Sequence, residues 1–164
     1  MDKLPEEFTI FTVGHSNHEL EKFIDLLRPH RIDVLVDIRS NPFSRFAPQF
    51  NKKGIEKAVK ANGMKYLFLG RELGGRPHGS EFYDADGFVL YDRLAESPLF
   101  LEGIQRLVKG IKTYRVALMC SEENPANCHR HLLVGRILAG RGVNVQHVRK
   151  DGKVQAEVEL AGGM

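Results

Sequence analysis

Two cysteines, a small net charge and the absence of long apolar runs are the first features of this 164-residue sequence. Two cysteines are too few for a disulfide-rich secreted scaffold, and they fit a reduced, cytoplasmic protein. The longest apolar runs, such as Val34, Leu35 and Val36, have the length of strands and are too short to cross a bilayer. The first ten residues carry acidic side chains and no apolar h-region, so we expect no secretory signal and no membrane contact. The net charge of +3 does not by itself indicate nucleic-acid binding.

Linkers, repeats and nucleotide-binding loops are missing as well. Without a Gly-, Ser- or Pro-rich linker, and with 42% hydrophobic residues, residues 1–164 are expected to form a single domain with its own core. No Gly-x-Gly-x-x-Gly or Walker loop is present, so neither a nicotinamide nor an ATP cofactor is indicated, and no cofactor is expected. No pattern in the sequence bears on the oligomeric state.

Strand-like and helix-like segments alternate along the chain. The predicted strands cover 8–13, 32–36, 64–69, 114–119 and 143–148, with a possible short sixth strand in 154–160. The predicted helices begin at a Ser16–Glu19 capping box, at Asn51, at Ser97–Pro98 and at Asn124–Pro125, and the second and fourth of them end at Gly63 and Gly142. Residues 40–50 are expected to be irregular, and 70–86 to form a glycine-rich loop. This order predicts an α/β fold in three layers, with a mostly parallel sheet of about five strands and helices on both faces.

Polar clusters follow the first four predicted strands. The clusters are 14–16, 37–39, 70–72 and 120–122. Because the carboxyl ends of parallel strands lie at one edge of a sheet, and ligands bind there, we expect these clusters to surround one cleft. The candidate catalytic residues in this cleft are His15, Asp37 and Glu122, which are suited to proton transfer. Structural roles are open for all three: a loop hydrogen bond for His15, a buried ion pair for Asp37 and a helix N-terminal charge for Glu122.

Arginines and glycines predict that the ligand of this cleft is an anion. Guanidinium groups bind carboxylate or phosphate with two parallel hydrogen bonds, and glycines allow the backbone to approach a ligand closely. Helix N-termini expected near Asn17 and Pro125 favour an anion too. The candidate substrate-binding or anion-binding residues are Gly14, Ser16, Arg39, Arg45, Arg71, Gly74, Gly75, Arg76, Cys120, His129 and Arg130. Phe43, Phe46 and Phe50 alternate with Arg45, which fits either stacking on nucleic-acid bases or attachment of the loop to the core.

The two cysteines raise the question of thiol or metal chemistry. Cys120 ends a strand before a predicted helix, where a thiolate is stabilised, as in rhodaneses and cysteine phosphatases. Their loop has an arginine six residues after the cysteine, whereas this chain has Ala126 there. Cys120, Cys128 and His129 match no usual zinc spacing, so no metal is predicted, and both cysteines are interpreted as small buried residues.

Five segments, taken together, resemble the domain of unknown function 488 family. They read VGHSN at 13–17, VDIRSNPFSRF at 36–46, PQFN at 48–51, YLFLGRELGG at 66–75 and VALMCSEENPANCHR at 116–130, and they span most of the chain. The resemblance implies a compact α/β fold without an established activity. The polar positions that it implies are His15, Ser16, Asp37, Arg39, Arg45, Gly74, Gly75, Cys120, Glu122, Cys128, His129 and Arg130.

Three functions are compatible with these patterns. The first is an enzyme, a hydrolase or transferase, that acts on a phosphate-bearing nucleotide or nucleic-acid substrate in the arginine-rich cleft. The second is a non-catalytic module that binds nucleic acid or a small anion through arginine and phenylalanine side chains. The third is a thiol enzyme of the rhodanese or phosphatase kind, in which Cys120 is required.

Overall fold

The structure is a computed structural model that describes residues 8–162. The strands are β1 (Thr9–Gly14), β2 (Val34–Asp37), β3 (Lys65–Phe68), β4 (Val116–Cys120), β5 (Asn144–Val148) and β6 (Val154–Ala156). The helices are α1 (Leu20–Leu27), α2 (Lys52–Ala61), α3 (Gly70–Leu73), α4 (Tyr91–Leu94), α5 (Pro98–Gly110), α6 (Arg136–Gly140) and α7 (Glu157–Gly162), with a π-helical segment (Arg130–Gly135) directly before α6.

The six strands form one sheet in the order β3-β2-β4-β1-β5-β6. All neighbouring pairs are parallel except β5 and β6, which are antiparallel. The predicted α/β class and mostly parallel sheet are therefore confirmed. The possible sixth strand exists as well, although it covers three residues only and the chain continues as α7.

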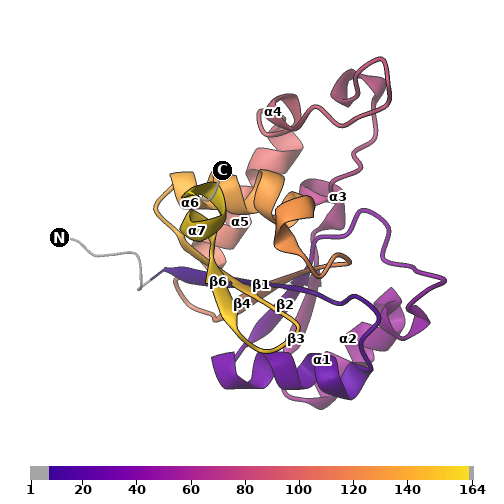
Figure 1. Cartoon of the computed structure of the whole chain (residues 1–164), viewed down its shortest axis with the longest axis vertical. Coiled ribbons are helices and arrows are strands. Elements are labelled where there is room, and N and C mark those ends of the chain that lie inside the picture. Colours follow the sequence, from indigo (N-terminus) through magenta and orange to yellow (C-terminus); the bar gives the residue numbers. More distant parts are fainter. Residues whose placement is uncertain (1–7, 163–164) are drawn as a thin grey trace.

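Helices cover both faces of the sheet, as Figure 1 shows, and each face has its own hydrophobic core. On one face α1 and α2 bury Phe23, Ile24, Ile55 and Val59. On the other face lie α3, α5 and α6, which bury residues such as Leu73, Phe100, Ile104 and Leu138. Burial of both faces explains why β2 and β4 are apolar almost throughout.

The central strand β4 lies between β2 and β1. After β1 and β2 the chain continues to α1 and α2 on one face, whereas after β4 it continues to α6 on the other face. Neighbouring parallel strands whose connections leave toward opposite faces form a crevice at their carboxyl ends. The order of the strands therefore creates a crevice at the ends of β2, β4 and β1.

Three local predictions are wrong. The Ser16–Glu19 pair is no capping box: α1 begins at Leu20 with Glu19 as its N-cap, and Ser16 has a left-handed backbone with φ of 48°. The helix predicted from Asn124 begins only at Arg130, since Pro125–Asn127 form a separate 3₁₀ turn and Cys128 is extended. The start of the predicted glycine-rich loop is helical, as α3.

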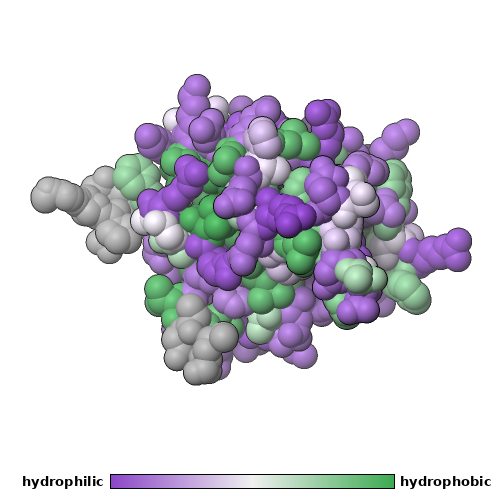
Figure 2. All heavy atoms as spheres, turned by 90° about the horizontal axis from the view of Figure 1, so that it is seen from above, coloured by the Kyte–Doolittle hydropathy of each residue, from purple (hydrophilic) through white to green (hydrophobic). Residues whose placement is uncertain are grey.

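The surface of the molecule carries both hydrophilic and hydrophobic residues. The face seen in Figure 2 is covered mainly by hydrophilic residues, with hydrophobic residues in small groups between them. Within residues 8–162, no helix is both long enough and apolar enough to cross a membrane.

Candidate functional site

A polar pocket of about 460 Å³ lies in the crevice at the carboxyl ends of β2 and β4. Its walls come from the loops after these two strands, from the segment after α3 and from the start of α4. The lining residues are Arg39, Ser40, Asn41, Gly75, Arg76, Tyr91, Cys120, Ser121, Glu122, Asn127, Cys128 and His129.

Arg39 is the buried cation of this pocket, and Asp37 holds it. Arg39 Nε and Nη2 donate to the two carboxylate oxygens of Asp37 at 2.9 and 2.8 Å, and the Arg39 backbone N–H donates to the same carboxylate at 3.1 Å. The Tyr66 hydroxyl from β3 donates to Asp37 Oδ2 at 2.6 Å, and burial raises the pKa of Tyr66 above its ordinary value. This network fixes the plane of the guanidinium group.

His15 contacts the same guanidinium from the end of β1. Its Nδ1–H donates to the Ser16 carbonyl at 2.7 Å, so Nε2 is the acceptor for Arg39 Nη1 at 3.2 Å. Burial lowers the pKa of His15 from 6.5 to about 4, so the ring is neutral at physiological pH. The ring also stacks on Phe50, with centroids 4.6 Å apart. His15 therefore orients Arg39, and the left-handed backbone of Ser16 places the carbonyl that fixes the tautomer of the histidine.

Arg39 keeps free donors for a ligand. A guanidinium group has five N–H donors. Within the described part of the chain three of them are used, by Asp37 and His15, so two remain at a residue that lines the pocket. The exposed Arg76 adds a second cation to the lining, and its backbone N–H donates to Ser40 Oγ at 2.8 Å. A small anion fits this arrangement.

Both cysteines meet at the floor of the pocket as free thiols. Their Sγ atoms lie 2.7 Å apart, Cys120 at the end of β4 and Cys128 before the π-helical segment. His129 Nε2 donates to the Ile38 carbonyl at 3.0 Å, which leaves Nδ1 facing Cys128 Sγ at 3.6 Å. Cys128 and His129 therefore place a thiol next to an imidazole, and the two groups can exchange a proton.

Cys128 is the thiol whose pKa this environment lowers. The hydrogen bond from Cys120 is the main cause that lowers the pKa of Cys128, and contacts with His129 and the Arg130 backbone N–H add to it. Burial raises the pKa of Cys120, which favours Cys120 as the donor and the Cys128 sulfur as the acceptor in the contact between them. Because Cys128 is extended, its sulfur accepts from the first N–H of the helix that follows.

The structure brings together about half of the predicted site residues. Those that line the pocket are Arg39, Gly75, Arg76, Cys120, Glu122 and His129, while Asp37 and His15 lie directly behind Arg39. Glu122 is exposed at the rim.

The remaining predicted residues lie outside the pocket lining of the described chain. Ser16, Arg45 and Arg71 are exposed. Gly14 and Gly74 serve packing: a Cβ on Gly14 would overlap the Glu122 backbone, and one on Gly74 would overlap Ser40. Arg130 is fully buried, and its Nη2 donates to the Glu123 carbonyl at 2.6 Å.

The sequence analysis named Cys128 only as a motif position and interpreted it as a small buried residue, and it did not single out Tyr66. Cys128 has the adjacent His129 and the resemblance to the family as signals, but its partner Cys120 is eight residues away and only the fold shows that the two sulfurs meet. Tyr66 lies within strand β3, and nothing in the sequence around it indicates that its hydroxyl binds a carboxylate.

Residues 19–137 match the family described as Domain of unknown function DUF488. This match covers well over half of the chain. The chain belongs to the DUF488 family. The matched range includes every lining residue of the pocket of this DUF488 domain, from Arg39 to His129, whereas β1, β5, β6 and α7 lie outside the range. No curated protein and no solved structure matches the chain.

Proposed function

We propose that this DUF488 protein is a cysteine-dependent enzyme that acts on a small phosphate-bearing substrate, with Cys128 as the nucleophile. One observation carries the proposal: the Cys128 sulfur, held by Cys120, His129 and a helix N–H, lines the same pocket as Arg39. A thiolate beside a fixed guanidinium group is suited to attack on an electrophile that carries negative charge.

The reaction proceeds in two displacements. The Cys128 thiolate attacks the phosphorus atom, an S–P bond forms, and the P–O bond to the leaving group breaks. His129 in its protonated form gives the proton on Nδ1 to the leaving oxygen. Water or another acceptor then attacks the phosphorus, His129 Nδ1 takes up the proton, and the S–P bond breaks to restore the thiolate. Arg39 and Arg76 offset the charge of the phosphoryl oxygens throughout.

The buried groups behind Arg39 have a positioning role in this proposal. Asp37 uses both carboxylate oxygens on Arg39, and the His15 lone pair is occupied by Arg39 Nη1. Neither group is free to accept a substrate proton while these bonds persist. Proton transfer by His15 and Asp37 stays a prediction, and so does proton transfer by Glu122, which lies at the rim where water has access.

The proposal is tested with p-nitrophenyl phosphate under reducing conditions, with release of nitrophenol and intact protein mass as the two readouts. We expect turnover and a phosphoryl adduct on Cys128, both abolished in Cys128→Ser. Cys120→Ser is the matched control because its hydroxyl still donates to the Cys128 sulfur, and it should retain the adduct. Equal turnover in Cys128→Ser and the unmodified protein would contradict the proposal.

A nucleic-acid-binding module is the second candidate, and the loop after β2 favours it. Phe43 and Phe46 are 61% and 89% exposed, and the exposed Arg45 lies between them in the chain. Exposed aromatic rings beside a cation stack on unpaired bases. The test is fluorescence anisotropy with a single-stranded oligonucleotide between 50 and 200 mM salt. Binding that weakens steeply with salt and is lost in Phe43→Ala/Phe46→Ala would favour this function, whereas absence of binding removes it.

A further inference from the structure

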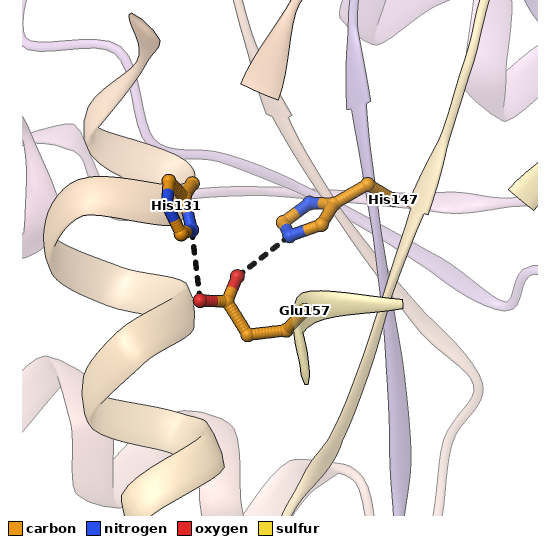
Figure 3. Close-up of side chains that lie close together, drawn as sticks. All are labelled: His131, His147 and Glu157. Carbon is orange, nitrogen blue, oxygen red and sulfur yellow. Dashed lines mark hydrogen bonds and ion pairs between the residues drawn. The ribbon is translucent and has the colours of Figure 1, made fainter. Parts of the chain in front are cut away.

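A second polar cluster, which contributes no residue to the pocket lining, is buried where the π-helical segment, β5 and α7 meet, and Figure 3 shows its three side chains. The Glu157 carboxylate lies between two imidazole rings: His131 Nδ1 is 2.8 Å from Oε2 and His147 Nε2 is 2.7 Å from Oε1. The three residues are at most 9% exposed. Their ligand-type atoms all lie within 4.8 Å of one another.

Three separate elements supply this cluster. His147 is on β5, Glu157 begins α7, and His131 lies in the π-helical segment. A π-helical turn inside a helix is uncommon and occurs often at functional sites, because it turns one side chain away from its regular direction. Gly135 in the same turn makes room for the carboxylate, since a Cβ there would come within 2.9 Å of Glu157 Oε1. The local backbone is therefore arranged around these side chains.

His147 has a polar contact on its second ring nitrogen as well. Thr12 Oγ1 on β1 lies 2.6 Å from His147 Nδ1. When Nε2 binds a metal ion, Nδ1 carries the proton and donates it, which fixes the ring toward the ion.

We propose that His131 Nδ1, His147 Nε2 and the Glu157 carboxylate form a binding site for one divalent transition-metal ion of the zinc type. Two imidazoles and one carboxylate suit zinc and similar ions, whereas Mg²⁺ and Ca²⁺ prefer oxygen ligands alone. The ion takes the place of the two protons that Glu157 now shares with the rings, and these protons move to His131 Nε2 and His147 Nδ1. Three protein ligands leave a further position for water or an anion.

The two positive charges of a bound ion have to be balanced, because a buried arginine lies nearby. The buried Arg130 guanidinium is near enough to lower the pKa of His147, and it opposes a second cation. Its Nε and Nη1 have no hydrogen-bond partner among residues 8–162, so they are available to an anionic species. Glu157 offsets one charge of the ion, and hydroxide or another anion on the open position offsets the other.

The first test measures zinc binding to the reduced, metal-stripped full chain by calorimetry and by metal analysis after dialysis. The expected result is one zinc per chain, with affinity at least tenfold lower in Glu157→Gln and His147→Gln. Thr12→Val, which removes the outer hydrogen bond alone, should weaken zinc binding about 10- to 100-fold. His78→Gln, a change at an exposed histidine, is the matched control and should bind as the unmodified chain does.

Cobalt distinguishes this site from the cysteine pair. The three ligands contain no sulfur, so Co²⁺ should give visible d–d bands without the near-ultraviolet thiolate band. Cys120→Ser/Cys128→Ser should retain one metal ion, which separates this proposal from the proposed thiol chemistry. A thiolate band, or loss of the metal in the double cysteine variant, would overturn the assignment.

Thermal unfolding with and without zinc tests the proposed site even when a variant is less stable than the unmodified chain. A ligand of the native state alone raises the melting temperature. Zinc at 100 times its dissociation constant should raise the Tm of the full chain by several degrees, and it should raise the Tm of Glu157→Gln by no more than about half as much. No shift in the unmodified chain, or an equal shift in Glu157→Gln with its fold intact by circular dichroism, would show that the cluster is a structural hydrogen-bond network.

Discussion

At the scale of single residues, Arg39 explains why several buried polar groups lie in an otherwise apolar layer. An arginine that is 4% exposed needs a counter-ion and fixed acceptors, because burying an unpaired charge is costly. Asp37 supplies the counter-ion, His15 supplies a neutral acceptor, and Tyr66 binds the carboxylate from the third side. These contacts hold a cation at the pocket without exposing it.

Asp37→Asn should be among the most damaging polar substitutions in the chain. It removes the counter-ion of a buried guanidinium group, which costs about 3–5 kcal/mol of unfolding free energy. Tyr66→Phe removes only one hydrogen bond to the same carboxylate and should cost about 1.5–3 kcal/mol. Urea denaturation at pH 7 measures both. A loss under about 1 kcal/mol in Asp37→Asn would mean that the ion pair is not needed to hold Arg39.

At the scale of elements, the junction between β1 and β4 determines how closely the two strand ends approach. The backbone N–H groups of His15 and Ser16 donate to the carbonyls of Cys120 and Ser121, both at 2.9 Å, so the parallel pairing continues past the ends of both strands. Gly14 allows this approach because the Glu122 backbone occupies the place of a side chain. These N–H groups are therefore used within the protein, and they are not donors for an anion.

Gly14→Ala should separate the two strand ends. The added Cβ meets backbone rather than a movable side chain, so we expect a loss of at least about 2 kcal/mol in unfolding free energy. Gly110→Ala is the control: at the end of α5 its Cβ meets no atom of the described chain within 4 Å, and alanine there should be neutral or stabilise by up to about 1 kcal/mol. Similar effects of the two changes in denaturant unfolding would contradict this account of the junction.

Periodicity predicted the elements well and their local ends poorly. The five parallel strands and the helix after Ser97 follow from apolar patterns and a cap, and Ser97 Oγ does accept from the Phe100 N–H at 3.3 Å. The helix near Asn124 starts late because Asn124 caps only a 3₁₀ turn, and this pattern is identical in sequence to a true helix cap. The gathering of polar clusters at one edge of the sheet could be predicted from the order of the strands. The contact between Cys120 and Cys128 could not, because it depends on the irregular 3₁₀ turn between them.

At the scale of the whole molecule, buried histidines make the stability of the fold depend on pH. The pKa of His15 falls from 6.5 to about 4 on folding, chiefly because burial disfavours the imidazolium form. Above pH 6.5 both states hold a neutral ring, and between pH 6.5 and 4 the unfolded chain takes up a proton that the native chain does not. Stability is therefore lost as pH falls through this window.

His15→Gln should reduce the loss of folding stability at acid pH. From the two pKa values, the His15 contribution to the drop between pH 7 and pH 5 is about 2 kcal/mol. Glutamine still offers an oxygen to Arg39, so the variant is expected to fold. Urea unfolding at both pH values, compared between the variant and the unmodified chain, gives the difference. An equal drop in the two proteins would mean that His15 titrates in the native state as it does in the unfolded one.

The central claim is that the fold turns Cys128 into a thiolate inside an anion-binding pocket, and it can be tested without knowing the substrate. The measurement is the rate of Cys128 alkylation by iodoacetamide against pH, with the labelled peptide identified by mass spectrometry. We predict a midpoint well below about 8.5, the ordinary thiol value, and slower labelling in the presence of inorganic phosphate. Protection by phosphate should be lost in Arg39→Gln. A midpoint at or above 8.5, with no protection by phosphate, would contradict the account.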